Sequence, residues 1–171
     1  TQTEAFKAGL FEVQDASSQM LCAALPIDPG MRVLDLCAGA GGKSLAVAAL
    51  GGRVTATDIR SSALNELEKR ARRAGAEIAI DEPEPAPIVL VDAPCSGSGR
   101  LRRNPALRWG LTDGAHLDTQ KSLILAATEL VAPGGLLAYA TCSLFGREND
   151  HRVPDGWQVE DEQTLWPHRD G

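Results

Sequence analysis

The sequence lacks long hydrophobic runs, because charges, glycine or proline interrupt every apolar stretch well before the ~20 residues that span a bilayer. Its first residues carry acidic side chains early and lack the basic-then-apolar layout of a secretory signal. We therefore expect neither a membrane helix nor an exported precursor, and we predict a cytoplasmic location.

Paired cysteines are also absent. The four cysteines form no CxxC pair and no cluster with histidine, so neither zinc nor another metal is expected. They fit reduced thiols better than a disulfide framework, and a buried, inert thiol is the default interpretation of each. The cysteines are Cys22, Cys37, Cys95 and Cys142.

A large excess of positive charge is missing too, since 17 Lys and Arg face 23 Asp and Glu, for a net charge of −6. Taken alone, this acidity argues against a nucleic-acid partner. However, residues 148–171 hold two basic and seven acidic side chains, which leaves the other 147 residues close to neutral. One stretch without any acid is rich in arginine, which suits phosphate groups: Arg100, Arg102, Arg103 and Arg108.

Segments typical of strands and of helices alternate along the chain. Strands are predicted over 32–36, 53–58, 87–92 and 135–143, and helices over 43–50, 61–75 and 117–131. Alternation of this kind predicts an α/β domain with a parallel sheet and helices on both faces. Ser61 or Ser62 is predicted to cap the second helix and Gly75 to end it, while Pro-Gly-Gly at 133–135 ends the third.

Two segments are unusually short for such a fold. Residues 76–87 leave room for only one short strand, and residues 147–157 change abruptly from helix-like to turn-like composition. We hypothesise that flexible segments are missing from the sequence there. An intact mass equal to 18.1 kDa would exclude this hypothesis.

A glycine-rich loop follows the first strand, which ends at Asp35. Gly39, Gly41 and Gly42 allow the backbone to approach a ligand closely and direct N–H groups of the next helix toward it. The spacing fits neither GxGxxG, whose third glycine would fall at Ser44, nor a Walker loop, whose first glycine would replace Cys37.

The second strand ends at Asp58. A carboxylate there either accepts hydrogen bonds from two ribose hydroxyls or caps the following helix. A glycine-rich turn with an acid at a strand end, without phosphate-binding features, suits an adenosine-type ligand such as S-adenosylmethionine.

Two cysteines fall just beyond strand ends. VLVDAPCSGSG (89–99) places Asp92 and Cys95 past one strand, and AYATCS (138–143) places Cys142 at the end of another. In open α/β sheets the ligand crevice lies outside the carboxyl ends of the strands, so the two thiols are predicted to converge there. Because thiolates are strong nucleophiles near neutral pH, this position favours chemistry over packing.

The motifs LDLCAGAGGKS, VTATDIR, VDAPCSGSGRLRRNPALRW and PGGLLAYATCS, preceded by GLFEVQDASSQML, together resemble the Sun/RsmB-type RNA (cytosine-5) methyltransferases. The resemblance runs from about Gly9 to about Asn149. It implies a class I S-adenosylmethionine-dependent (Rossmann-like) fold. That sheet normally closes with a final antiparallel strand, which we expect to be missing here, and residues 156–163 are predicted as the sixth strand.

The resemblance also implies a mechanism. Cys142 would add to carbon 6 of the cytosine and so activate carbon 5, and Cys95 would assist release of the product. Asp92 would hydrogen-bond the base, and Lys43 would lie near the cofactor or the base. Packing at the start of the helix is the alternative for Lys43.

Binding residues follow from the same motifs. Cofactor contacts are expected from Cys37, Ala38, Gly39, Ala40, Gly41, Gly42, Lys43, Asp58, Asp81 and Asp92. RNA contacts are expected from Arg100, Arg102, Arg103, Arg108 and Trp109. Ribosomal RNA is the expected partner, with transfer RNA as the alternative.

We interpret residues 1–171 as a single catalytic domain, with a helical lead-in (1–30), a cofactor and catalytic core (31–147) and an acidic C-terminal segment (148–171). A non-catalytic RNA-binding module that keeps this fold is the main alternative function. A small-molecule methyltransferase is a third, which does not need two thiols at strand ends.

Overall fold

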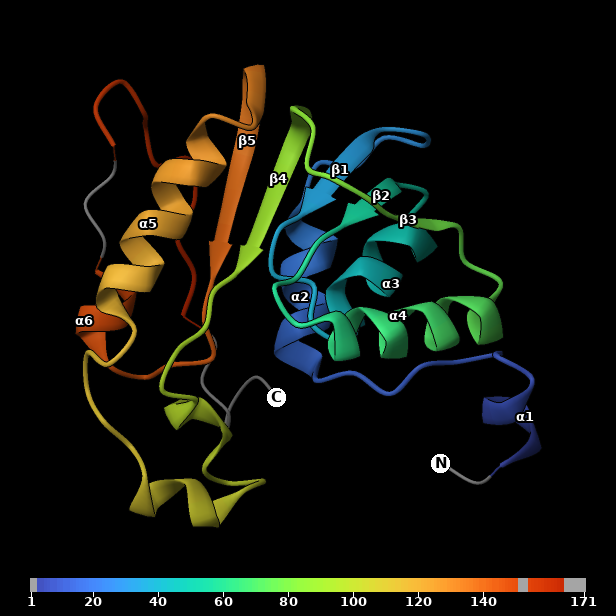
Figure 1. The fold of residues 1–171 in the computed structure, drawn as a ribbon, viewed down its shortest axis with the longest axis horizontal. Helices are drawn as coiled ribbons and strands as arrows, with labels where there is room; N and C mark the ends of the chain where they lie inside the picture. Colours follow the sequence, from blue (N-terminus) through green and yellow to red (C-terminus); the bar gives the residue numbers. More distant parts are fainter. Residues whose placement is uncertain (1–2, 151–153, 165–171) are drawn as a thin grey trace.

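A computed structural model of the chain describes residues 3–150 and 154–164. One sheet of parallel strands, in the order β3-β2-β1-β4-β5, forms the centre of the fold (Figure 1). Its strands are β1 (Arg32–Asp35), β2 (Arg53–Ala56), β3 (Ile78–Ile80), β4 (Ala86–Asp92) and β5 (Val131–Ala140). The predicted parallel α/β sheet is therefore confirmed.

Helices cover both faces of this sheet (Figure 1). On one face, α3 (Gly42–Ala49) and α4 (Ser61–Ala74) pack with Val33 and Val54. On the other face, α5 (Leu117–Thr128) packs with Leu34 and Val89. The neighbours Val33 and Leu34 serve opposite cores because successive strand residues point to opposite faces.

Shorter helices lie at the ends and in the loops. They are α1 (Glu4–Lys7), α2 (Ala16–Ala24), α6 (Gly146–Asn149) and the 3-10 helices η1 (Ser98–Arg100) and η2 (Pro105–Trp109). The predicted helical lead-in is thus helical only in part. Within the described residues, no helix is long and apolar enough to cross a membrane.

Two predicted boundaries are wrong. The third predicted helix ends at Thr128, and β5 already begins at Val131, so Pro-Gly-Gly at 133–135 lies inside the strand. Proline cannot donate to a ladder, and the pairing of β4 with β5 shifts register between Ala86 and Ile88, which lets the strand accommodate these residues.

The cap of α4 also differs from the prediction. Arg60 is the N-cap, without a side-chain hydrogen bond, and Ser61 is already the first helical residue. The helix ends as predicted at Gly75, whose φ of +65° is the left-handed conformation that glycine adopts without strain.

The short segment before β4 forms the one short strand expected there, β3, and residues 81–85 then lead to β4 without a helix. Residues 156–163 contain no strand, so the predicted sixth strand is wrong. Residues 165–171 lie outside the described residues, and the expectation that the final antiparallel strand is missing stays a prediction.

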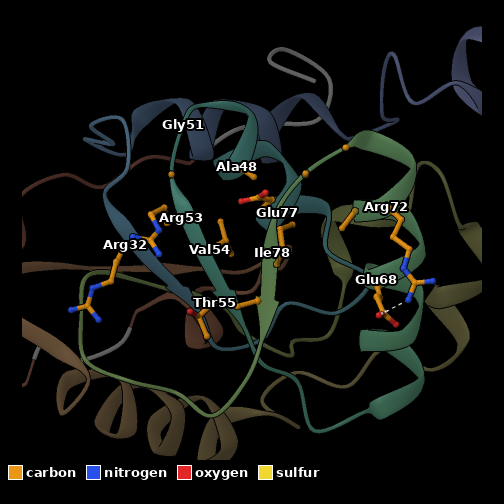
Figure 2. A pocket seen from close by; sticks show the side chains of 15 residues that line it. Arg32, Ala48, Gly51, Arg53, Val54, Thr55, Glu68, Arg72, Glu77 and Ile78 are labelled. Carbon is orange, nitrogen blue, oxygen red and sulfur yellow. Dashed lines mark hydrogen bonds and ion pairs between the residues drawn. The ribbon is translucent and has the colours of Figure 1, made fainter.

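A cavity of about 730 Å³ opens where β1, β2 and β3 begin (Figure 2). Arg53 and Ile78 line it, and Arg72 and Glu68 close one side with an ion pair of 2.5 Å. This is the opposite end of the strands from the predicted site residues, so the cavity is not part of the candidate site.

Candidate active site

The strand order creates a switch point between β1 and β4. The chain leaves β1 for α3 on one face of the sheet and leaves β4 for α5 on the other. Ligands of open α/β sheets bind outside the carboxyl ends of the strands at such a point. The glycine-rich loop follows β1 and the Cys95 loop follows β4, so both lie at this switch point.

The glycine-rich loop is tied to its surroundings through backbone atoms. The Ala38 N–H donates to Thr57 O at 3.0 Å, and the Gly39 N–H donates to the Asp58 carboxylate at 2.8 Å. Two side chains that the sequence did not single out also hold the loop. Arg70 donates to Ala40 O at 2.6 Å, and Gln14 donates to Gly42 O at 3.0 Å.

Asp58 lies just beyond β2 and does not cap α4, which excludes one of its two interpretations. Its carboxylate accepts from the Gly39 N–H and from the backbone and side chain of Arg60. Burial raises the pKa of Asp58, but the hydrogen bonds from Arg60 and Gly39 outweigh burial and hold the pKa below its ordinary value. The Arg60 side chain is 65% exposed, so it contacts Asp58 from the solvent side.

Asp35, at the end of β1, is buried beneath the loop. One oxygen accepts from the Ser44 hydroxyl at 2.7 Å, while the other has no hydrogen-bond partner. Burial raises the pKa of Asp35 to about 6, against the lowering effect of Ser44.

Lys43 and Asp92 form an ion pair of 2.6 Å across the switch point. Lys43 comes from the first turn of α3 and Asp92 from the last residue of β4. Their side chains are 13% and 39% exposed, so Asp92 is the one open to a ligand.

Cys95 and Cys142 meet beside this pair, with their sulfur atoms 3.4 Å apart. The hydrogen bond from Cys142 lowers the pKa of Cys95 to about 7, and the same contact raises the pKa of Cys142 far above its ordinary value. Two thiols that share one proton behave in this way, because the first proton leaves easily and the second is retained. Cys142 is the exposed member and Cys95 is half-buried.

The other two cysteines differ from this pair. Burial raises the pKa of Cys22 to about 11 and that of Cys37 to about 12. Both thiols therefore stay protonated and unreactive near neutral pH. Within the described ranges, no three His, Cys, Asp or Glu side chains gather as a metal site requires.

The arginine-rich stretch forms η1, η2 and the turn between them. Arg108 stacks on the ring of Trp109 at 4.4 Å, and the Trp109 side chain is 81% exposed. Arg103 forms an ion pair with Asp15, which also caps α2. Arg100 ends η1, and Arg102 follows it in the exposed turn.

Asp81 lies in the exposed loop after β3, where its carboxylate accepts from the Glu82 N–H at 2.8 Å. It therefore occupies the same edge of the sheet as Asp58, at the next strand outward.

Sequence reasoning missed Glu148, a fully buried carboxylate in α6 that contacts the residues after both site cysteines. Gln14 and Arg70 were missed as well. A signal was present for Glu148, since it follows Cys142 by only six residues, but its segment was interpreted as a discontinuity.

Comparison with known proteins identifies the family. A family model described as 16S rRNA methyltransferase RsmB/F matches residues 22–169. A probable ribosomal RNA small subunit methyltransferase B from Synechocystis is 36% identical, in an alignment that covers 99% of this chain and 40% of that protein. The chain thus spans about two fifths of the length of this curated relative.

Solved structures show the same fold. NSun6 from Pyrococcus horikoshii, solved with SFG, matches with a TM-score of 0.76 and 28% identity over 87% of this chain and 42% of that one. A methyltransferase homologue from Pyrococcus horikoshii matches with a TM-score of 0.69 and 30% identity over 86% of this chain and 51% of that one. These matches confirm the predicted methyltransferase fold, and the chain belongs to the RsmB/F family of 16S rRNA methyltransferases.

Proposed function

We propose that the chain is the catalytic domain of an S-adenosylmethionine-dependent methyltransferase that modifies carbon 5 of a cytosine in ribosomal RNA. One observation carries the proposal: two thiols from the ends of β4 and β5 lie 3.4 Å apart beside the Lys43–Asp92 ion pair. Family membership supports the RNA substrate.

In the proposed reaction the sulfur of Cys142 attacks carbon 6 of the cytosine and forms a C–S bond, which moves electron density to carbon 5. The exposure of Cys142 makes it the more accessible nucleophile. Its proton has an acceptor 3.4 Å away, the Cys95 sulfur, whose pKa of about 7 leaves a large fraction of this thiol ionised at neutral pH. Proton transfer between the sulfurs therefore places the negative charge on Cys142 as it attacks.

Carbon 5 then takes the methyl group that S-adenosylmethionine supplies when bound. Cys95 releases to solvent the proton that it took from Cys142, and its thiolate then accepts the proton of carbon 5. The electrons of that C–H bond re-form the C5–C6 double bond, and the C–S bond breaks with its electron pair on the Cys142 sulfur. Asp92 hydrogen-bonds the base and so helps to stabilise the adduct, and Lys43 orients the Asp92 side chain through the 2.6 Å contact.

The residues present fit S-adenosylmethionine, which supplies an electrophilic methyl group when bound. The loop over residues 37–42 brings backbone close to the switch point, and Gly41 adopts a φ of +81° that no side chain would permit there without strain. Asp58 offers an ionised carboxylate for ribose hydroxyls once Arg60 turns outward, and Asp81 offers a second acid from the neighbouring strand.

RNA would approach along η1 and η2. The exposed Trp109 ring provides a surface on which an unpaired base stacks, and the neighbouring arginines provide donors for phosphate. Because carbon 5 and carbon 6 are inaccessible in a stacked duplex, the target cytosine is unpaired or flipped out.

The proposal is tested with labelled S-adenosylmethionine and two RNAs, 16S ribosomal RNA and transfer RNA. We expect label on ribosomal RNA, none after Cys142→Ala, and with Cys95→Ala a protein–RNA adduct that resists denaturation. Undiminished transfer by Cys142→Ala would exclude Cys142 as the nucleophile, and label only on transfer RNA would correct the substrate. RNA binding without heat from S-adenosylmethionine in calorimetry would instead indicate a non-catalytic module.

A further inference from the structure

The β4–β5 ladder ends before it reaches the two cysteines. Its last paired residues are Asp92 and Ala140, followed by one more bond from the Ala93 N–H to Ala140 O at 2.8 Å. Cys95 and Cys142 lie beyond this point, in loops that one further backbone bond joins, from the Gly99 N–H to Cys142 O at 2.9 Å. This bond fixes the backbone of Cys142 but does not contact Cys95, so side-chain contacts must add to it in keeping the two sulfurs 3.4 Å apart.

Glu148 lies between these two loops. Its carboxylate accepts from the backbone N–H of Ser96 at 2.9 and 3.2 Å and from the hydroxyl of Ser143. Ser96 follows Cys95 directly and Ser143 follows Cys142 directly. One side chain therefore contacts the residue after each cysteine.

A group of hydroxyls extends this connection. The Ser143 hydroxyl lies 3.1 Å from that of Ser96 and 3.3 Å from that of Ser98, and Ser98 accepts from the Leu144 N–H at 2.7 Å. Because Glu148 accepts only, it sets the direction in which the Ser143 hydroxyl points. The carboxylate thus orders the hydrogen bonds that cross from one loop to the other.

A carboxylate is rarely buried completely unless it forms hydrogen bonds or an ion pair. The residue is 0% exposed, and among the described residues no Lys or Arg forms an ion pair with it. Burial raises the pKa of Glu148, but hydrogen bonds from Ser143 and Ser96, with a smaller electrostatic contribution from His116, outweigh burial and hold the pKa below its ordinary value. An ionised carboxylate that is removed from water persists only where its hydrogen bonds compensate for lost hydration.

We propose that Glu148 is a positioning residue that holds the Cys95 and Cys142 loops at reactive spacing. The proposal rests on the proposed function for its catalytic meaning, since Glu148 is buried and acts through the residues that follow the two cysteines. The spacing of the two thiols, which the proposal predicts to depend on Glu148, can be measured without any enzymatic turnover.

Glu148→Gln is the direct test, because the amide keeps the shape but turns one acceptor oxygen into a donor that faces the Ser96 N–H or the Ser143 hydroxyl. Phenylarsine oxide, which binds two thiols at once only when they are close, is the probe. We expect wild type and the exposed control Glu129→Gln to bind it equally and Glu148→Gln to bind at least about tenfold more weakly. Cys142→Ser should abolish tight binding and so identify the pair.

Ser143→Ala provides a second variant should Glu148→Gln fail to fold, since it removes one hydrogen bond to the carboxylate and no charge. It should bind phenylarsine oxide more weakly than wild type, though less so than Glu148→Gln. In methylation assays both variants should lower kcat and leave the KM for RNA near the wild-type value, because the RNA-binding arginines are untouched. Wild-type affinity for the arsenical in every folded variant would overturn the proposal, whereas a wild type that binds it but never methylates RNA would overturn only the proposed function.

Discussion

Replacing Gly41 by alanine should destabilise the fold more than the same change at Gly75. Both residues have positive φ, +81° and +65°. An added Cβ at position 41 would lie 2.5 Å from Cγ of Leu67, whereas at position 75 it would meet nothing within 4 Å. Leu67 is fully buried and cannot move aside cheaply. The pair thus separates backbone strain from steric conflict.

The magnitudes follow from these two contributions. A left-handed conformation costs an L-residue roughly 1–2 kcal/mol, and the reduced freedom of the unfolded chain offsets about half of it. Gly75→Ala should therefore lose about 1 kcal/mol. Overpacking against Leu67 adds about 1–3 kcal/mol, so Gly41→Ala should lose about 2–4 kcal/mol in total.

Urea-induced unfolding measures both free energies, and equal slopes would show that the variants expose the same surface on unfolding. Calorimetry with S-adenosylmethionine adds a second measurement. Gly41→Ala should bind at least about tenfold more weakly because the cofactor loop shifts, while Gly75→Ala, at the far end of α4, should bind as wild type does. Equal destabilisation of the two variants would refute the steric argument.

Three further predictions concern charge. Alkylation of Cys95 by iodoacetamide should have a midpoint near pH 7, and Cys142→Ala, which removes the hydrogen bond that lowers the Cys95 pKa, should move the midpoint upward. Identical midpoints by mass spectrometry would contradict the shared proton. The pKa of Asp35 is about 6 in the folded chain against about 4 when unfolded. The unfolded state therefore releases its proton first as pH rises, and stability should fall by up to about 3 kcal/mol between pH 4 and pH 6. Asp35→Asn should remove that part of the pH dependence of urea unfolding, and an unchanged profile would contradict the assignment. Arg103→Gln should weaken RNA binding, and the slope of log K against log salt concentration should become less steep by about 0.7. Asp15→Asn keeps the cap of α2 but removes the ion pair with Arg103, so it should tighten RNA binding. Anisotropy titrations in which both variants match wild type would exclude a role for Arg103.

The central elements could be predicted because their signals are local. Residues 87–92 form an apolar run that is typical of a strand buried on both faces, and Gly75 ends α4 as its conformational freedom suggests. The prediction failed where contacts between residues far apart in the sequence overrode a local signal. Pro-Gly-Gly at 133–135 is a strong helix stop, yet it lies within β5 because pairing with β4 shifts register there.

The candidate site shows the same division. That Cys95 and Cys142 lie at one edge follows from parallel strands alone, since the carboxyl ends of all such strands share that edge. That they touch requires β4 and β5 to be neighbours, which the strand order shows and no local pattern encodes. The role of Glu148 was harder to predict than the contact between the two cysteines. Its contact with Ser96 spans 52 residues of sequence and depends both on that strand order and on a four-residue helix too short for any periodicity to reveal. A buried acid near a nucleophile is visible in the sequence only as an ordinary charge, and its role follows from its burial and from the hydrogen bonds that it accepts from Ser96 and Ser143.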